Sequence, residues 1–283
     1  MKNVQVLMST YNGEKYLKEQ LESILNQKGV RINILVRDDG SKDNTISILK
    51  EYKEIKFFES NNIGCTQSFL ELIKYAGDYD FYAFADQDDV WDEDKILIAT
   101  QYLKSYKKPA LYSSDTRLVD ENLNFIKNEF INPTTTLGSA ISKNYVTGCT
   151  TVFNSMLMNY LKKYSPKSAP FHDWWANLVC LAVGGFSIYD NKPHISYRQH
   201  GNNVVSGNNN LFIKWFKRLQ KFNKPYHREL FVKELIENYS DHISSQNKYI
   251  LNSMLNKKYI KEMRTKNFID DILFRICIFC GKV

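Results

Sequence analysis

The sequence lacks long apolar runs, a cysteine pattern typical of disulfide-bonded proteins, internal repeats and low-complexity segments. None of its apolar stretches approaches the roughly 20 residues that a membrane-spanning helix needs. Its five cysteines are odd in number and scattered, which is typical of reduced thiols in a cytoplasmic protein. Cys277 and Cys280 form a C-x-x-C, but without a second ligand pair or a preceding strand they predict neither a zinc nor a redox site. The start, MKNVQVLMSTYNG, does not resemble a secretory signal, so we expect a cytoplasmic protein.

The composition is globular, and the charge is unevenly distributed. Hydrophobic residues make up 43% of the 283 residues and charged residues 24%, enough apolar material for a substantial core. Residues 1–210 carry 23 Lys+Arg and 24 Asp+Glu, whereas residues 211–283 carry 15 and 7. A basic tail of this kind suits an anionic membrane surface, nucleic acid or a solvated helical face. Since no nucleic-acid motif accompanies the charge, we expect no nucleic-acid partner.

Apolar runs alternate with helical patterns in the first half of the chain. Between the runs, apolar residues such as Leu17, Leu21 and Ile24 share one helical face. This alternation predicts an α/β fold with a mostly parallel sheet covered by helices on both faces. From Leu211 the chain turns helical, including residues 211–222 and 226–239. Strands are predicted at residues 4–8, 32–36, 55–59, 81–85, 110–114, 150–153 and 186–190, with a further short strand after residue 194.

Polar clusters follow three of the predicted strands. They are STYNG at residues 9–13, RDDGS at 37–41 and DQDD at 86–89. Ligands of parallel sheets bind beyond the carboxyl ends of the strands, so all three clusters are expected to face one crevice. The D-x-D of Asp86 and Asp88 offers oxygen ligands that suit Mg²⁺ or Mn²⁺. The alternative is an acidic turn of no special function.

Two later stretches also carry candidate functional groups. Asp173 follows His172 at the start of an apolar helix, where it is either a helix-capping residue or a general base with access to an acceptor hydroxyl. The adjacent Trp174 offers a flat face for a sugar ring or belongs to the core. In YRQHGNN (197–203), Arg198 and His200 could meet a diphosphate or a metal ion, or lie in a surface turn.

Taken together, these stretches resemble the family-two inverting glycosyltransferases of the GT-A fold. STYNGEKYLKEQLESILNQ, VRDDGSKDNT and FADQDDVW follow the amino-terminal pattern of that family. TGCTTVF, HDWW and YRQHGNN further resemble its bacterial rhamnosyltransferase branch. One departure is NNIGCTQSF, where Cys65 and Gln67 stand in place of the apolar residue and lysine that relatives often carry.

The resemblance implies a GT-A (Rossmann-like) catalytic domain over residues 1–210 and a basic helical C-terminal region over 211–283. Within the domain, residues 1–115 would form the nucleotide-sugar half and 116–210 the acceptor half. The implied site comprises Ser9, Thr10, Tyr11, Asp39 and Asp86 for the nucleotide, Asp88 and His200 for Mg²⁺ or Mn²⁺, Asp173 as catalytic base, and Asp89, Trp91, His172, Trp174 and Arg198 on the side of the sugars.

The resemblance also implies a reaction. It is the transfer of a sugar with inversion, L-rhamnose from dTDP-L-rhamnose, onto a saccharide acceptor. The resemblance implies that this acceptor is a lipid-linked intermediate in the synthesis of a bacterial surface polysaccharide. The alternatives are a UDP-hexose donor or a non-catalytic sugar-nucleotide-binding module. A nucleotidyltransferase would carry a Gly-rich basic loop after the first strand, and STYNGEKYL has only Gly13 and Lys15.

The C-terminal region suggests where in the cell the protein acts. An apolar stripe along residues 268–279, together with the basic excess, could lie on the inner face of the plasma membrane as a peripheral contact. The same stripe could instead pack on the domain or against a second copy in a homodimer.

Overall fold

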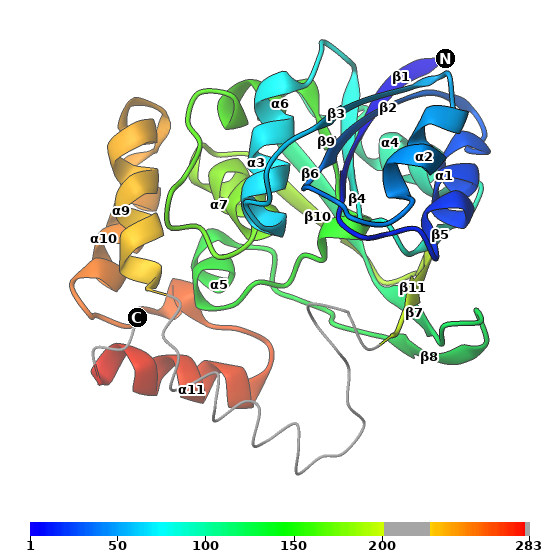
Figure 1. Cartoon of the computed structure of the whole chain (residues 1–283). Helices are drawn as coiled ribbons and strands as arrows, with labels where there is room; N and C mark the ends of the chain where they lie inside the picture. Colours follow the sequence, from blue (N-terminus) through cyan, green and yellow to red (C-terminus); the bar gives the residue numbers. More distant parts are fainter. Residues whose placement is uncertain (201–226, 281–283) are drawn as a thin grey trace.

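A seven-stranded sheet forms the centre of the structure, a computed structural model that describes residues 1–200 and 227–280 (Figure 1). The strand order is β10-β6-β9-β4-β1-β2-β3, and every neighbouring pair is parallel except those that involve β9. The predicted α/β fold with a mostly parallel sheet is therefore confirmed. The strands are β1 (Lys2–Thr10), β2 (Val30–Asp38), β3 (Ile55–Glu59), β4 (Phe81–Ala85), β6 (Ala110–Ser114), β9 (Val152–Asn154) and β10 (Phe186–Asp190).

Six helices bury both faces of this sheet. They are α1 (Leu17–Leu25), α2 (Thr45–Glu51), α3 (Cys65–Tyr75), α4 (Lys95–Leu103), α6 (Ser155–Leu161) and α7 (His172–Ala182). Side chains alternate along a strand, so β4 sends Phe81, Ala83 and Ala85 into a core with α1, α2 and α4. Its other two residues, Tyr82 and Phe84, enter a second core with α3, α6 and α7. Burial on both faces explains why β4 is apolar throughout.

A second, four-stranded sheet lies beyond the carboxyl ends of the parallel strands (Figure 1). Its order is β5-β11-β7-β8, from strands β5 (Val90–Trp91), β11 (Ile195–Arg198), β7 (Thr116–Val119) and β8 (Phe125–Glu129). The pairing of β11 with β5 brings residues 195–198 beside the acidic segment that follows β4. The sequence predicted a strand at β11 but not the β7–β8 pair.

The described part of the C-terminal region is helical, as expected, and packs on the main domain. Its residues Phe231, Leu235, Met254 and Phe274 belong to the same core cluster as α7, and Phe231 lies edge-on to the Trp174 ring. The predicted helical stretch at 211–222 lies outside the described residues. The helices of this region are α9 (Arg228–Tyr239), α10 (Ser245–Leu255) and α11 (Phe268–Phe279), with the 3-10 turns η2 (Ser240–His242) and η3 (Lys261–Met263). The main domain also contains helix α5 (Leu137–Ser142) and the 3-10 turn η1 (Gly148–Thr150).

Across residues 1–200 and 227–280, every helix is too short or too polar to cross a membrane.

The packing of η3 on α5 depends on a glycine. The Ser142 hydroxyl of α5 donates to the carbonyl of Met263 at 2.8 Å. At Gly138, a Cβ atom would collide with the Glu262 carbonyl group and the Met263 nitrogen. Only a residue without a side chain therefore allows η3 to approach α5 this closely.

We expect Gly138→Ala to lower the free energy of unfolding by about 1 to 3 kcal/mol, the usual cost of overpacking. Ser245→Ala, at an exposed position at the start of α10, serves as the control and should stay within about 0.5 kcal/mol of the wild type. Denaturant unfolding measures both. Equal stability of Gly138→Ala and wild type would show that η3 is not packed on α5.

Candidate active site

The three polar clusters meet at one edge of the large sheet, as their strand-end positions predict. Thr10 lies beside Asp38 in the parallel pairing of β1 and β2, and its hydroxyl donates to the Asp38 carboxylate at 2.8 Å. Gln87 joins the loop after β4 to the loop after β1. Its side-chain oxygen accepts from the Tyr11 N–H at 2.8 Å, and its amide nitrogen donates to the Tyr11 carbonyl at 3.1 Å.

Of the residues predicted to line the nucleotide pocket after β1, Tyr11 is the exposed one. Its side chain is 46% exposed, so an aromatic face is available at the edge of the sheet. Thr10 is buried, and the Ser9 hydroxyl is paired with that of Ser68 at 2.6 Å. The Gln87 amide also packs closely against Gly13 of this turn.

Asp39 is buried and holds the entry to helix α3. It accepts from the backbone N–H groups of Ile63 at 2.8 Å and Gly64 at 2.9 Å. The buried Arg37 guanidinium also donates to it at 2.5 Å and reaches Glu71 of α3. Asp39, the carboxylate predicted to meet the base, therefore contacts the loop that leads to α3. The first residue of that helix, Cys65, is exposed.

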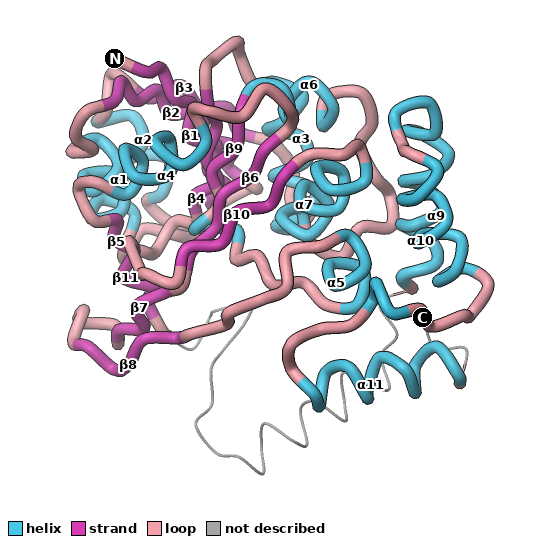
Figure 2. Tube along the Cα trace, turned by 180° about the vertical axis from the view of Figure 1, so that it is seen from behind, coloured by secondary structure: helices cyan, strands magenta, loops and turns pink. Residues whose placement is uncertain are grey.

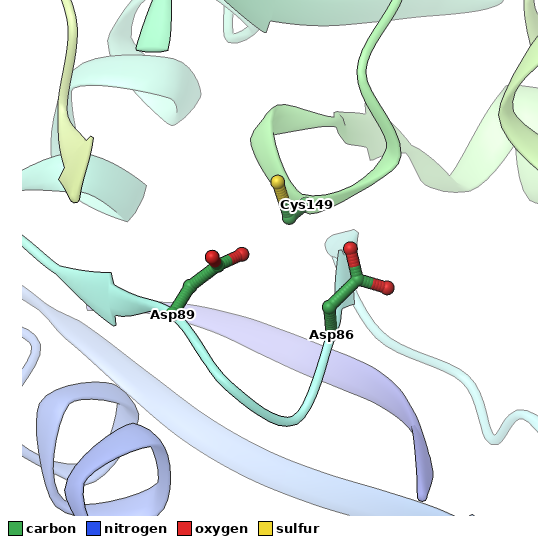
Figure 3. Close-up of side chains that lie close together, drawn as sticks. All are labelled: Asp86, Asp89 and Cys149. Atoms are coloured by element: carbon green, nitrogen blue, oxygen red, sulfur yellow. The ribbon is translucent and has the colours of Figure 1, made fainter. Parts of the chain in front are cut away.

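A cluster of acidic groups occupies the end of β4. Asp86, Asp89 and the Cys149 sulfur of η1 place potential ligand atoms within 4.8 Å of one another (Figure 3). Burial and the charges of Asp88 and Asp173 raise the pKa of Asp86 to about 7. Burial also raises the pKa of Asp89 well above its usual range, with further contributions from Asp88 and Asp86. Neighbouring carboxylates that disfavour one another's ionisation form a site that a divalent cation would neutralise.

His200 closes this cluster from the C-terminal side. Its Nε2 lies 2.7 Å from Asp88 Oδ2, the pair that the resemblance assigned to a metal ion. The imidazole ring stacks on Tyr16 with ring centroids 5.1 Å apart. Carboxylate oxygens are ligands that suit Mg²⁺ or Mn²⁺, and a neutral imidazole nitrogen is a common metal ligand. Burial raises the pKa of the Cys149 thiol, which therefore stays protonated and is a poor ligand for such hard ions.

Arg198 lies beneath the acidic loop, with its guanidinium buried. Its backbone N–H donates to Asp89 Oδ1 at 3.1 Å and its Nε to the Asp88 carbonyl at 2.8 Å. The other end of the guanidinium donates to the Glu121 carbonyl and the Glu19 carboxylate, at 2.6 and 2.5 Å. The sequence placed Arg198 beside the sugars, whereas these contacts make it a residue that positions the Asp88–Asp89 loop.

Lys95 is a buried cation that the sequence did not single out. Its side chain from α4 is 1% exposed, and Nζ lies 3.4 Å from the centroid of the Trp91 ring. Burial lowers the pKa of Lys95 to about 7, and the charge of Asp89 acts in the opposite direction. A buried ammonium group whose charge is disfavoured in this way is a weak counterion for the carboxylates of the cluster.

Asp173 begins helix α7 at the same edge. It is 8% exposed, and its Oδ1 accepts from the Trp174 N–H at 2.6 Å and the Asn144 amide at 3.1 Å. Burial raises the pKa of Asp173 to about 6, and these hydrogen bonds act against that rise. A carboxylate with a pKa just below neutrality is ionised at pH 7 and basic enough to accept a proton.

His172 lies beside Asp173 as a neutral group. Its ring stacks on Phe69 with centroids 3.8 Å apart, and burial lowers its pKa to about 3. A Cβ atom on Gly148 would lie 3.0 Å from His172 Nε2 and 3.5 Å from Asp173 Oδ2. Gly148 of η1 therefore lies directly against the two side chains that open α7, and a Cβ atom there would press on the His172 ring.

The two tryptophans predicted on the sugar side pack in the core. Trp91 and Trp174 are 3% and 2% exposed. The Trp174 indole N–H donates to the Ala140 carbonyl at 2.6 Å, and Arg228 stacks over its ring. Neither ring offers a face to a sugar in this structure, and Asp89 is likewise fully buried.

A mostly parallel sheet with a carboxylate cluster at its carboxyl edge is the arrangement of the GT-A glycosyltransferases. The crystal structure of S. aureus TarS 1-349 in complex with UDP-GlcNAc has this fold, with a TM-score of 0.59 and 20% identity over 90% of this chain and 72% of that chain. A sequence model of Glycosyl transferase family 2 matches residues 5–165, more than half of the chain. The chain therefore belongs to Glycosyl transferase family 2.

Two curated relatives indicate the range of donors. The chain is 28% identical over 294 residues to the dTDP-rhamnosyl transferase RfbG of Shigella flexneri, covering 95% of this chain and 92% of that protein. It is also 28% identical over 177 residues to an Escherichia coli enzyme, the UDP-Glc:alpha-D-GlcNAc-diphosphoundecaprenol beta-1,3-glucosyltransferase WfgD. That match covers 59% of this chain and 64% of WfgD.

The raised pKa of Asp86 predicts a pH-dependent effect on stability. Ionising Asp86 costs folding free energy above pH 7, and the cost disappears as the pH falls to about 4, the pKa of an unfolded aspartate. Without divalent ions, we therefore expect Asp86→Asn to be more stable than wild type at pH 8, by about 2 kcal/mol.

Denaturant unfolding at pH 8 and pH 4 measures this effect, and the difference between the two proteins should vanish at pH 4. Asp78→Asn, an exposed aspartate before β4, is the control that should change stability at neither pH. A destabilised Asp86→Asn at pH 8 would contradict the like-charge description of the cluster.

Proposed function

We propose that the chain is an inverting rhamnosyltransferase that moves L-rhamnose from dTDP-L-rhamnose onto a saccharide acceptor. The observation that carries this proposal is the position of Asp173. Its carboxyl, with a pKa of about 6, stands close enough to the acidic end of β4 to raise the pKa of Asp86. The similarity to RfbG over nearly the whole chain supports L-rhamnose as the donor sugar.

The nucleotide would bind across the carboxyl ends of β1, β2 and β4. The exposed Tyr11 ring would stack on the base, with Ser9, Thr10 and Asp39 forming the floor beneath it. Asp86 would contact the ribose. Asp88 and His200 would hold Mg²⁺ or Mn²⁺, which when bound supplies positive charge to the leaving diphosphate. Arg198 would keep both aspartates in place through its contacts to their loop.

The reaction would be a single displacement at the anomeric carbon. The acceptor hydroxyl attacks that carbon from the side opposite the nucleotide, while Asp173 accepts the hydroxyl proton. The bond from the anomeric carbon to the diphosphate oxygen breaks, and the nucleoside diphosphate leaves with the electron pair. One displacement inverts the configuration, so a β-linked donor yields an α-linked product. His172, neutral and stacked on Phe69, would shape the wall of the site next to Asp173.

The acceptor would be a lipid-linked saccharide in the synthesis of a bacterial surface polysaccharide. Support comes from WfgD, whose name specifies a diphosphoundecaprenol acceptor. Such an acceptor would bring the enzyme to the inner face of the plasma membrane. WfgD also supports a second candidate donor, because its name specifies UDP-Glc. Under either donor the roles proposed for Asp88 and Asp173 are the same.

We expect Asp173→Asn to lower the rate of sugar transfer by about 10²- to 10⁴-fold, because the amide cannot accept the proton. Donor affinity should stay within a few-fold of wild type, since Asp173 serves the acceptor side. The measurement is nucleoside diphosphate release from dTDP-L-rhamnose, UDP-glucose, UDP-galactose and UDP-N-acetylglucosamine with mixed lipid-linked saccharides. Turnover of one donor identifies it, and full activity in Asp173→Asn would exclude this residue as the base.

Removal of divalent ions should abolish transfer, and Mn²⁺ or Mg²⁺ should restore it. A second readout is the melting temperature, which Mn²⁺ should raise because a ligand that binds only the folded state adds about 2.7 kcal/mol at 100 times its Kd. Asp88→Asn should lose both effects, whereas the exposed control Asp78→Asn should keep both. Unchanged rates in EDTA would show that the cluster works without an ion.

A further inference from the structure

Helix α11 is apolar on two opposite sides. Its inner side, with Phe274, Cys277 and Ile278, is buried in the core that contains α7. Its outer side is exposed to solvent. We call it the outer face of α11, and its residues with their exposed fractions are Phe268 (73%), Ile269 (50%), Ile272 (38%), Ile276 (42%) and Phe279 (91%).

The outer face is a continuous stripe along the helix. At 3.6 residues per turn, its five side chains fall within an arc of about 100°. An exposed apolar stripe of this kind indicates a surface that contacts an apolar phase or partner. The inner side already accounts for the packing of α11 on the domain.

The acidic groups of α11 are paired with cations. Lys143 Nζ lies 2.6 Å from Asp270 Oδ2, and Arg275 lies 2.9 Å from Asp271 Oδ2. Both carboxylates therefore add little negative charge to the surface around the outer face.

The segment that leads into α11 is strongly basic and exposed. Between residues 257 and 267 it presents five exposed cations against a single exposed acid, Glu262. The cations are Lys257, Lys258, Lys261, Arg264 and Lys266. The apolar stripe is thus bordered by positive charge, the combination that binds anionic lipid surfaces.

Helix α11 lies on the same side of the molecule as the carboxyl edge of the sheet. In Figure 1 the parallel strands run away from the N-terminus at the top, and their carboxyl ends face the side where α11 lies. Figure 2 shows the same arrangement from behind. The edge strand β8 lies on this side too, and Phe125 and Phe130 beside it are 62% and 68% exposed.

We propose that the outer face of α11 and its basic border dock on an anionic lipid bilayer, with the apolar side chains inserted at the level of the headgroups. Docking in this way directs the carboxyl edge of the sheet, and with it Asp173, toward the membrane surface. The binding itself needs no sugar donor. Only its purpose, access to a lipid-linked acceptor, rests on the function proposed above.

A second copy of the chain fits this surface less well. A two-fold interface is formed by the same surface of both copies, so it would gather two sets of the cations between residues 257 and 266 with only one exposed acid, Glu262, in each set. Like charges in apposition oppose association, whereas anionic headgroups attract them at about 1 kcal/mol per Lys or Arg.

The test is sedimentation of the full chain with vesicles of phosphatidylglycerol and phosphatidylcholine, and with vesicles of phosphatidylcholine alone. We expect binding to the anionic vesicles that weakens with salt, and at least tenfold weaker binding to the neutral ones. Two variants should each reduce binding at least tenfold: Phe268→Gln/Ile276→Gln/Phe279→Gln on the outer face, and Lys257→Gln/Lys261→Gln/Arg264→Gln on its border.

The control is Tyr75→Gln/Tyr102→Gln, which removes exposed aromatic side chains near the C-terminal ends of α3 and α4 and should bind vesicles like the wild type. Retention of the wild type in the supernatant, or wild-type binding by the outer-face variant, overturns the proposal. So does sedimentation equilibrium in which the wild type is a dimer and the outer-face variant a monomer. If the protein binds a sugar-nucleotide donor but not vesicles, the docking proposal fails and the transferase proposal stands. The two proposals can therefore fail separately.

Discussion

Repulsion among carboxylates at the end of β4 is the constraint on which the rest of the site depends. Asp86, Asp88 and Asp89 leave the sheet within one short loop, and Asp173 enters from α7. Burial and mutual charge raise the pKa of Asp86 to about 7, and burial raises that of Asp173 to about 6. A fold that gathers these groups loses stability, so their proximity is explained by a ligand that supplies positive charge. The nucleoside diphosphate and divalent cation proposed above would together be such a ligand.

Long-range contacts hold this unfavourable cluster in place. Arg198 reaches back from β11 to fix the Asp88–Asp89 loop, and Gln87 ties that loop to Tyr11. His200, which follows β11, contacts Asp88 in the same loop. The second sheet therefore contributes to the site, because its strand β11 carries Arg198 and leads His200 to the edge of the first sheet. The C-terminal helices then extend the core behind α7, the helix that begins with Asp173. Positions distant in the sequence thus determine the geometry of one loop.

Much of the fold could be predicted from the sequence, because local pattern determines it. β3, β4, β6 and β10 have the predicted bounds, since each is a short apolar run between polar residues. The edge of the site was predictable because parallel strands end together. The roles of Arg198 and Gln87 could not be predicted. Arg198 contacts Asp88 over 110 positions and Gln87 contacts Tyr11 over 76, and contacts over such separations leave no local signal in the sequence. For the same reason the sequence left Trp174 open between sugar contact and core. Its burial and the packing of Phe231 against its ring decide for the core.

Calorimetric titration of dTDP into the wild type and Asp88→Asn, each with and without Mn²⁺, tests the central claim most directly. The cluster requires positive charge before it can accept a diphosphate, so the wild type should bind dTDP at least tenfold more tightly with Mn²⁺. Asp88→Asn should show no such gain. Equal affinity in all four titrations would contradict the account, because the acidic end of β4 would then be no part of a cation and diphosphate site.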